Sequence, residues 1–242
     1  MLEIRHKGMD STAATQQNYN EIYGSEGIRQ LDSFYLWLIS LLKPQPGKRL
    51  LDISCGEGQL VTFARKQNVQ AEGVDFAFTA VKCAYETDPQ SGWLVGDGEL
   101  LPIKSDTYDY VTHIGSLEHF QNPVEGIHEI TRVLKPGGKA CILLPNTYGL
   151  LGNIKHVVDT GDIFDDGQPL QRYNTRKGWQ VMLEDGGLLP YRIVKYERPW
   201  PRTGLDFTWY LRHPAKFLRL FISFLIPVNL GNCIVYLCKR EI

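Results

Sequence analysis

The sequence predicts an α/β fold in which helices cover both faces of a mainly parallel sheet. Strand-like and helical patterns alternate between residues 48 and 145. The strand-like runs are continuously apolar, which is typical of parallel strands buried on both faces. A glycine turn at residues 54–58 directly follows the first of these strands. This doubly wound arrangement binds ligands at the carboxyl ends of its strands, so we expect a binding site at that turn.

The chain before residue 46 is predicted to be separate from the sheet. Residues 1–15 are polar and mixed, which favours a loose terminus. Two helices are expected next, and the second, near 28–42, carries apolar residues at helical spacing and stops at Lys43-Pro44. We therefore predict an N-terminal helical cap over 1–45 and a main domain over 46–242.

The elements of the main domain follow in a regular order. Strands are expected near 48–54, 70–75, 92–97, 108–114 and 139–145, with helices near 59–67, 77–86 and 122–134. Lys135-Pro136-Gly137-Gly138 is expected to end the last of these helices and turn into the next strand. Residues 146–172 break the rhythm and are predicted to be a loop or lid. A helix near 175–185 and strands near 191–198 and 233–239 complete the prediction.

An insertion at about 199–231 separates the last two strands. Its apolar segment begins at Pro214, runs through Phe217–Ile226 and ends at Pro227, far short of the ~20 residues of a membrane span. With the flanking Arg198 included, five arginines and lysines against Asp206 give this region a local charge of +4. Three alternatives stay open: packing on the sheet, a lid over an apolar substrate, or peripheral membrane or lipid contact through residues 214–226.

Composition excludes several classes of protein. The 242 residues are 43% hydrophobic, which suits one domain with a full-sized core, and the net charge of −1 implies no general attraction to nucleic acid. The five cysteines form no Cys-x-x-Cys pair and have no zinc-type spacing to histidine. Nothing near Met1 has the pattern of a signal peptide. We expect a cytoplasmic protein, or one that is membrane-peripheral through the insertion.

The glycine turn is flanked by two acids that indicate the kind of ligand. Asp52 ends the first strand before Gly56 and Gly58, and Asp75 ends the second. An acid at the second strand tip is placed to accept hydrogen bonds from ribose hydroxyls. Asp52 would repel a pyrophosphate but attract an ammonium group, and Val61 occupies the third glycine position of a dinucleotide motif. A ligand with a ribose, an ammonium and no phosphate, such as S-adenosylmethionine, fits better than NAD.

Six motifs in order resemble the class I S-adenosylmethionine-dependent methyltransferases, in particular the small-molecule, quinone-biosynthesis-like branch (methyltransferase type 11). They are Leu51–Gly58, Gly73–Asp75, Gly96–Pro102, Tyr108–Val111, Ser116–Phe120 and Glu129–Gly138. One departure is Ser54, where the family usually has glycine. The resemblance implies that 46–242 is a methyltransferase catalytic domain, with a Rossmann-like seven-stranded sheet whose last strand is antiparallel.

The resemblance also implies roles for individual residues. Asp52 is expected to hold the amino group of the cofactor, Asp75 its ribose and Asp97 its adenine. Phe76 and Leu101 are expected to sandwich the purine, Ile114 and Gly115 to face the methionine portion, and Tyr19 and Tyr23 to close over the cofactor. The complete predicted cofactor set is Asp52, Ser54, Gly56, Gly58, Asp75, Phe76, Asp97, Gly98, Glu99, Ile114, Gly115 and Tyr23.

His119 is the candidate general base, because it follows the fourth strand beside the methyl site and imidazole titrates near neutrality. The competing interpretation is a structural histidine that braces the helix beginning near Asn122. Some quinone O-methyltransferases bind a divalent metal through Glu-x-x-Glu-His. Here Glu118 and His119 match, but Gly115 replaces the first glutamate, so no metal is predicted.

The sequence thus predicts an enzyme that transfers a methyl group by in-line displacement to a small, apolar or lipid-like acceptor, at oxygen or carbon rather than nitrogen. A catalytically silent scaffold of the same fold is the first alternative. An NAD-dependent oxidoreductase is the second, disfavoured by Val61. Methylation of nucleic acid is disfavoured, because the Asn/Asp-Pro-Pro-Tyr motif is missing.

Overall fold

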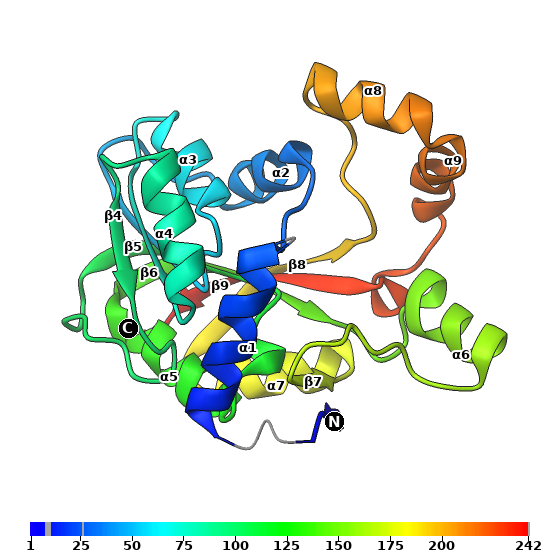
Figure 1. Cartoon of the computed structure of the whole chain (residues 1–242), viewed down its shortest axis with the longest axis horizontal. Coiled ribbons are helices and arrows are strands. Elements are labelled where there is room, and N and C mark those ends of the chain that lie inside the picture. Colours follow the sequence, from blue (N-terminus) through cyan, green and yellow to red (C-terminus); the bar gives the residue numbers. More distant parts are fainter. Residues whose placement is uncertain (8–10, 26, 242) are drawn as a thin grey trace.

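The computed structural model describes residues 1–7, 11–25 and 27–241, and a seven-stranded sheet forms its centre (Figure 1). The strands lie in the order β4-β3-β2-β5-β6-β9-β8. Their bounds are β2 (Arg49–Ile53), β3 (Gln70–Asp75), β4 (Gly92–Val95), β5 (Tyr108–Ile114), β6 (Leu134–Pro145), β8 (Leu188–Tyr196) and β9 (Cys233–Arg240). Strands β2 to β6 pair in parallel, whereas β9 runs antiparallel to both neighbours. The predicted fold class is confirmed.

Helices cover both faces of this sheet (Figure 1). Helices α2 (Asp32–Leu42) and α3 (Gln59–Arg65) pack on one face, and α5 (Pro123–Val133) and α7 (Arg176–Asp185) pack on the other. Adjacent strand residues point to opposite faces, so Leu50 joins the first of these cores and Leu51 the second. This explains why the strands read as continuously apolar. The other longer helices are α1 (Thr12–Ser25), α4 (Phe78–Thr87), α6 (Lys155–Thr160), α8 (Gly204–Arg212) and α9 (Pro214–Ser223).

The N-terminal segment corrects one prediction. Strand β1 (Leu2–Arg5) pairs antiparallel with β7 (Leu170–Tyr173), and α1 already begins at Thr12, so most of 1–15 is ordered structure and not a loose terminus. Residues 8–10 lie outside the described residues. A short strand of mixed polarity gives no periodic signal until its partner is known, and that partner lies about 165 residues away in the chain. The division at residue 45 stays a prediction.

Two further segments differ from the prediction. Strand β6 begins at Leu134, so Lys135–Gly138 lies within it and is not a turn before it. The predicted loop over 146–172 contains a π-helical turn (Leu150–Ile154), α6 and β7. The remaining strands and helices lie within a few residues of their predicted bounds. None of the helices in the described part of the chain is long and apolar enough to cross a membrane.

Candidate functional site

The turn between β2 and α3 is built from residues with left-handed backbone angles. Gly56 has φ +54° and Gly58 has φ +79°, and Ser54 also lies in this region with φ +57°. A Cβ at Gly58 would lie 2.2 Å from the Cη2 atom of Trp93, so the turn rests directly on this indole. Gly73, opposite Trp93 in the sheet, leaves room for the same ring. Trp93 was not identified from the sequence, because only the pairing of β3 with β4 brings it under the turn.

Asp75 ties this turn to the next strand end. Its Oδ2 accepts a hydrogen bond from the backbone N–H of Gly56 at 2.8 Å, and its Oδ1 accepts one from Ala77 at 2.9 Å. The side chain is buried, and burial raises the pKa of its carboxyl to about 6. Each oxygen keeps a second lone pair, so the carboxylate can still accept hydrogen bonds from a ligand.

Asp52 lies beside it at the end of β2. Its Oδ1 accepts a hydrogen bond from the hydroxyl of Thr112, its sheet neighbour on β5, at 2.6 Å. Burial raises the pKa of this carboxyl to about 7, and the nearby charge of Asp75 adds to the rise. Neither Asp52 nor Asp75 forms an ion pair within the part of the chain that the structure describes. A buried carboxylate without a cation is costly, so a ligand that supplies a positive charge fits this site.

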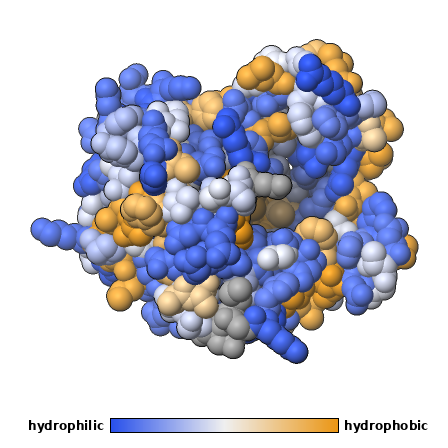
Figure 2. All heavy atoms as spheres, in the orientation of Figure 1, coloured by the Kyte–Doolittle hydropathy of each residue, from blue (hydrophilic) through white to orange (hydrophobic). Residues whose placement is uncertain are grey.

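Both acids line a cavity of about 950 Å³ at the carboxyl ends of the parallel strands. In Figure 2 the surface is hollowed between α1 and the helices α8 and α9. The predicted cofactor residues that line the cavity are Asp52, Ser54, Gly56, Asp75, Phe76, Asp97, Gly98, Glu99, Ile114, Gly115 and Tyr23, and Tyr19 lies with them. The fold therefore gathers residues from β2, β3, β5, α1 and the loop after β4 around one space.

Two residues with a predicted cofactor role lie elsewhere. Gly58 is absent from the cavity lining, and a Cβ there would meet Trp93, so this glycine shapes the turn by close packing, while its contact with a cofactor stays a prediction. Leu101 is buried in the core cluster with Ile53 and Val74 and does not line the cavity, so its predicted place on the purine is wrong. Its neighbour Leu100 is exposed. Which side chains of an irregular loop are buried in the core and which are exposed to solvent cannot be read from the sequence.

The two acids of the loop after β4, Asp97 and Glu99, have different hydrogen-bond partners. Glu99 accepts hydrogen bonds from the backbone N–H groups of Gln121 at 2.7 Å and Asn122 at 3.0 Å, so its carboxylate holds the loop that precedes α5. Asp97 accepts one bond, from the N–H of Glu99 at 2.9 Å, through Oδ1. Asp97 thus keeps more hydrogen-bonding capacity for a ligand than Glu99 does.

His119 lies in a short 3-10 helix (Leu117–His119) and lines the same cavity. Its Nδ1 is 2.5 Å from the carbonyl oxygen of Leu170. A carbonyl only accepts, so Nδ1 carries a proton and Nε2 presents a lone pair when the ring is neutral. Burial holds the pKa of His119 below its usual range, which favours the neutral ring. This contact fixes the ring to β7, whereas the structural interpretation had His119 brace the helix that begins near Asn122.

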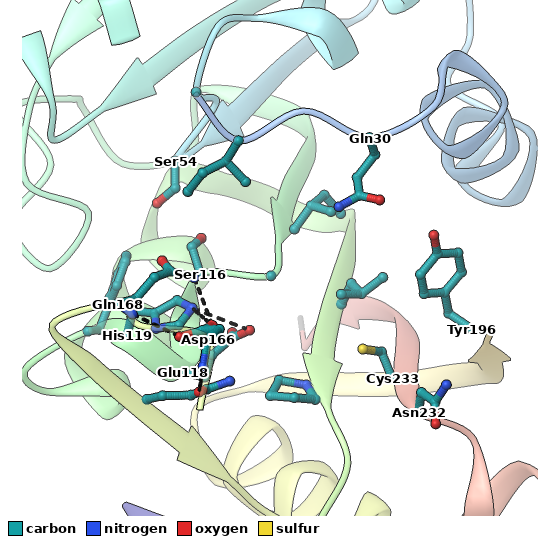
Figure 3. A pocket seen from close by; sticks show the side chains of 18 of the residues that line it. Gln30, Ser54, Ser116, Glu118, His119, Asp166, Gln168, Tyr196, Asn232 and Cys233 are labelled. Carbon is teal, nitrogen blue, oxygen red and sulfur yellow. Dashed lines mark hydrogen bonds and ion pairs between the residues drawn. The ribbon is translucent and has the colours of Figure 1, made fainter. Parts of the chain in front are cut away.

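Two carboxyl groups face the free nitrogen of His119 (Figure 3). Nε2 lies 3.9 Å from Oε1 of Glu118 and 3.8 Å from Oδ2 of Asp166. Glu118 is buried, its Oε2 has no hydrogen-bond partner among the described residues, and burial raises the pKa of its carboxyl to about 8. Asp166 was not predicted, because it comes from the segment 146–172, which carries no pattern of its own. No group of three His, Cys, Asp or Glu side chains in the described ranges is arranged to hold a metal.

The far end of the cavity is made by later parts of the chain. Tyr196, Asn232 and Cys233 lie opposite His119 across the cavity (Figure 3). The insertion contributes Arg219, whose Nη2 donates to the carbonyl of Leu151 at 2.7 Å and whose guanidinium lies 3.6 Å from Glu197. This end therefore combines apolar and basic groups, in contrast to the acidic end at Asp52 and Asp75.

Comparisons with known proteins agree with this geometry. Residues 51–142 match the family model described as "Methyltransferase domain". A demethylmenaquinone methyltransferase of Corynebacterium kroppenstedtii is 31% identical over 42% of this chain and 43% of its own length. A ubiquinone/menaquinone biosynthesis C-methyltransferase UbiE of Ruegeria sp. is 28% identical over 59% of this chain and 61% of its own. The chain thus spans about half the length of the curated relatives it matches.

Solved structures show the same fold over nearly the whole chain. The [4+2]-cyclase SpnF superposes with a TM-score of 0.68 and 16% identity, covering 96% of this chain and 97% of that chain. At this identity the likeness concerns the fold alone. Residues 51–142 are thus similar to the methyltransferase domain, and the acids around the glycine turn lie within this matched segment.

Proposed function

We propose that this protein binds S-adenosylmethionine and transfers its methyl group to a small, apolar or lipid-like acceptor at oxygen or carbon. The observation that carries the proposal is that one cavity is lined both by two buried carboxyl groups without an ion pair among the described residues and by His119, whose lowered pKa favours the neutral ring. The first feature suits a cationic ligand with a ribose, and the second suits an acceptor that must lose a proton.

The residues at the acidic end fit the cofactor group by group. Asp52 is proposed to hold the amino group, Asp75 the ribose hydroxyls, and Asp97 the exocyclic amine of adenine. Phe76 lines the cavity and offers an apolar surface to the purine. When bound, S-adenosylmethionine supplies a methyl group on a sulfonium, which is an activated leaving group.

The contribution of the protein to the reaction is then mainly alignment and proton removal. A cavity that holds the cofactor and the acceptor in alignment makes their reaction effectively unimolecular. Such positioning lowers the activation free energy by about 7–11 kcal/mol in favourable cases. His119 Nε2 is proposed to accept the proton of the acceptor's hydroxyl. Asp166, 3.8 Å away, stabilises the imidazolium that forms. A phenolic acceptor methylated at a ring carbon also loses a proton, so the same base serves either product.

The test of cofactor binding is calorimetric titration with S-adenosylhomocysteine and, in parallel, with NAD. We expect micromolar binding of S-adenosylhomocysteine and no binding of NAD. Binding of NAD alone would revive the oxidoreductase alternative, which is weakened by Val61, a fully buried residue on the face of α3 that packs against the sheet. Binding of neither would overturn the proposal.

The test of catalysis is His119→Gln, with His128→Gln as the matched control on the exposed face of α5. With a panel of phenolic acceptors, we expect kcat to fall about 10²-fold or more in the first variant and to stay unchanged in the second. The affinity for S-adenosylhomocysteine should be retained in both. An unchanged kcat for His119→Gln would remove this residue as the base.

One alternative has support of its own. The SpnF fold match is with a [4+2]-cyclase, so this architecture is not confined to methyl transfer. A chain that binds the cofactor but transfers no methyl group would match the catalytically silent scaffold. Retention of S-adenosylhomocysteine together with no methylated product from any acceptor would favour that alternative over the enzyme.

A further inference from the structure

The insertion carries an unusual concentration of exposed apolar side chains. On α8 and α9 and the turn after them, Leu205, Leu211, Leu218, Phe221, Phe224 and Leu225 are all more than half exposed. Leu205 is 78% exposed and Leu225 is 84% exposed. Figure 2 shows orange, hydrophobic residues along these helices. We call these six residues the insertion face. Exposed apolar side chains in this number on two short helices of a folded protein indicate a contact surface.

The opposite side of the insertion is fixed to the rest of the protein. Asp206 Oδ2 accepts hydrogen bonds from the backbone N–H of Ser33 at 2.6 Å and from its hydroxyl, which joins α8 to the start of α2. Lys195 donates to the carbonyls of Ser223 and Ile226 at the end of α9. The two helices are therefore held in place with their insertion face turned outward.

The charges around the insertion face have one sign. Arg202, Arg212 and Lys216 are exposed on and beside α8 and α9. Asp206 is the one acid between residues 198 and 231, and it is buried and committed to Ser33. The surface of the insertion thus carries positive charge alone, whereas the whole chain has a net charge of −1. The charge of the insertion is therefore opposite in sign to that of the whole chain, which indicates an anionic partner.

Aromatic packing adds a third feature. Trp200 is partly exposed, and its ring lies 5.1 Å from that of Phe221 and 5.8 Å from that of Phe224. Tryptophan and phenylalanine next to exposed cations are typical of helices that lie in the interface of a bilayer, with the apolar side chains in the acyl region and the cations at the headgroups. The helices are 9 and 10 residues long, which suits lying in the interface and excludes spanning it.

We propose that α8 and α9 dock the protein on a bilayer of anionic lipids through the insertion face and its flanking cations. This goes beyond the proposed reaction and does not depend on it. Because Arg219 on α9 lines the cavity, docking places the basic end of the cavity next to the lipid surface.

The experiment is vesicle flotation of the full chain with and without acidic lipid. Vesicles of pure phosphatidylcholine are compared with vesicles containing phosphatidylglycerol at low and high salt. We expect binding to the acidic vesicles that weakens with salt, and little binding to the neutral ones. Equal binding to both, or binding to neither, would overturn the proposal.

Matched variants distinguish binding through the insertion face from nonspecific hydrophobic binding to vesicles. Leu205→Ser and Leu225→Ser each remove an apolar side chain from the insertion face, and we expect each to lower the partition coefficient about tenfold or more. The controls are Leu100→Ser and Val158→Ser, at residues that are 78% and 80% exposed elsewhere on the surface. These should bind vesicles as the unchanged protein does. An equal loss in the controls, or no loss in the insertion variants, would contradict the assignment.

The charge is tested by Arg212→Glu and Lys216→Glu, with Lys104→Glu as the control outside the insertion. Each insertion variant should lose about fivefold or more in binding to acidic vesicles, and the control should lose little. S-adenosylhomocysteine affinity is measured on every variant, so failure of docking and failure of the proposed function are read separately. If the protein is instead a dimer that Leu225→Ser converts to a monomer, the insertion face is an interface between two copies and the lipid proposal falls.

Discussion

The two ends of the cavity are built in different ways. At the acidic end, the backbone fixes the turn and the position of the Asp75 carboxylate. Three residues with left-handed φ form the turn, and two backbone N–H groups donate hydrogen bonds to Asp75. At the other end, side chains from β6, β8, α9 and the segment 146–172 meet, and their contacts are with distant parts of the chain.

This difference separates what is shared with other proteins from what is particular to this chain. The family match covers residues 51–142, which supply the acidic end and His119, and stops before the residues of the far end. A site held by backbone groups tolerates little change, whereas loops and an insertion on the same scaffold can be altered without loss of the fold. We therefore expect substitutions at the acidic end to have the larger effects.

The largest effect is expected for Gly58→Ala. A Cβ there would meet Trp93 at 2.2 Å, and the backbone angle is unfavourable for any L side chain. We expect the free energy of unfolding to fall by about 2–5 kcal/mol, because backbone strain contributes about 1–2 kcal/mol and overpacking about 1–3 kcal/mol. Chemical denaturation measures it. Gly161→Ala, at the residue that follows α6, is the matched control.

Gly161 has a similar angle, φ +85°, but nothing lies within 4 Å of the position of a Cβ. Its substitution should therefore cost about 1–2 kcal/mol, the strain alone. If both variants lose the same stability, the contact of the turn with Trp93 is not what distinguishes the acidic end.

The next effect is on cofactor affinity in Asp75→Ala. The ribose hydroxyls lose a charged acceptor, so we expect the affinity for S-adenosylhomocysteine to fall by on the order of 1–3 kcal/mol in calorimetry. Asp75→Asn keeps one acceptor oxygen and should lose less. Asp162→Ala, an exposed acid between α6 and β7, is the control and should bind as the unchanged protein does. Unaltered binding in Asp75→Ala would place the ribose elsewhere.

A smaller effect is expected from pH. Burial raises the pKa of Asp52 to about 7 and that of Asp75 to about 6, so both carboxyls gain protons as the pH falls through this range. A cationic amino group prefers the ionised form. Affinity for S-adenosylhomocysteine should therefore be greatest above pH 7 and decline below it, by at most about tenfold per pH unit per group.

Asp52→Asn tests the source of that pH dependence. In the unchanged free protein the raised pKa means that the folded state binds more protons than the unfolded state, so stability falls as the pH rises from about 4 to 7. The amide variant lacks this loss and should be more stable than the parent at pH 8, while binding the cofactor more weakly. If Asp52→Asn is less stable than the parent at pH 8, the ionised carboxylate of Asp52 does not destabilise the folded protein.

The smallest effect is expected for Ser54→Gly. Glycine relieves the left-handed angle of Ser54 but adds freedom to the unfolded chain, so the net gain in stability should be about 0.5–1 kcal/mol. Lys43→Gly, at φ +52° after α2 and outside the site, should gain a similar amount. A loss of stability in Ser54→Gly alone would mean that the serine makes a contribution that the angle does not account for.

The sequence was most informative where the functional residues lie next to a strand and a turn in the same short segment. Asp52, Gly56 and Asp75 were recognised because strand, turn and acid follow one another within a few residues, and the structure places all three on the cavity. Leu101 was misplaced because the direction of its side chain depends on packing in the core, and the close approach of Gly58 to Trp93 depends on the pairing of two strands. Asp166 was missed because its approach to His119 depends on the tertiary position of the segment between α6 and β7, which no local pattern indicates.

The sequence by itself determined the fold class, the order of the seven strands of the central sheet along the chain, and the acidic end of the cavity, because periodicity and turn chemistry are local. Only the tertiary structure decided that β1 pairs with β7, that Leu170 sets the tautomer of His119, and that the insertion buries Asp206 while it exposes Leu205 and Leu225. These features join residues more than 50 positions apart. Such contacts depend on how the elements pack, and no local pattern in the chain records that.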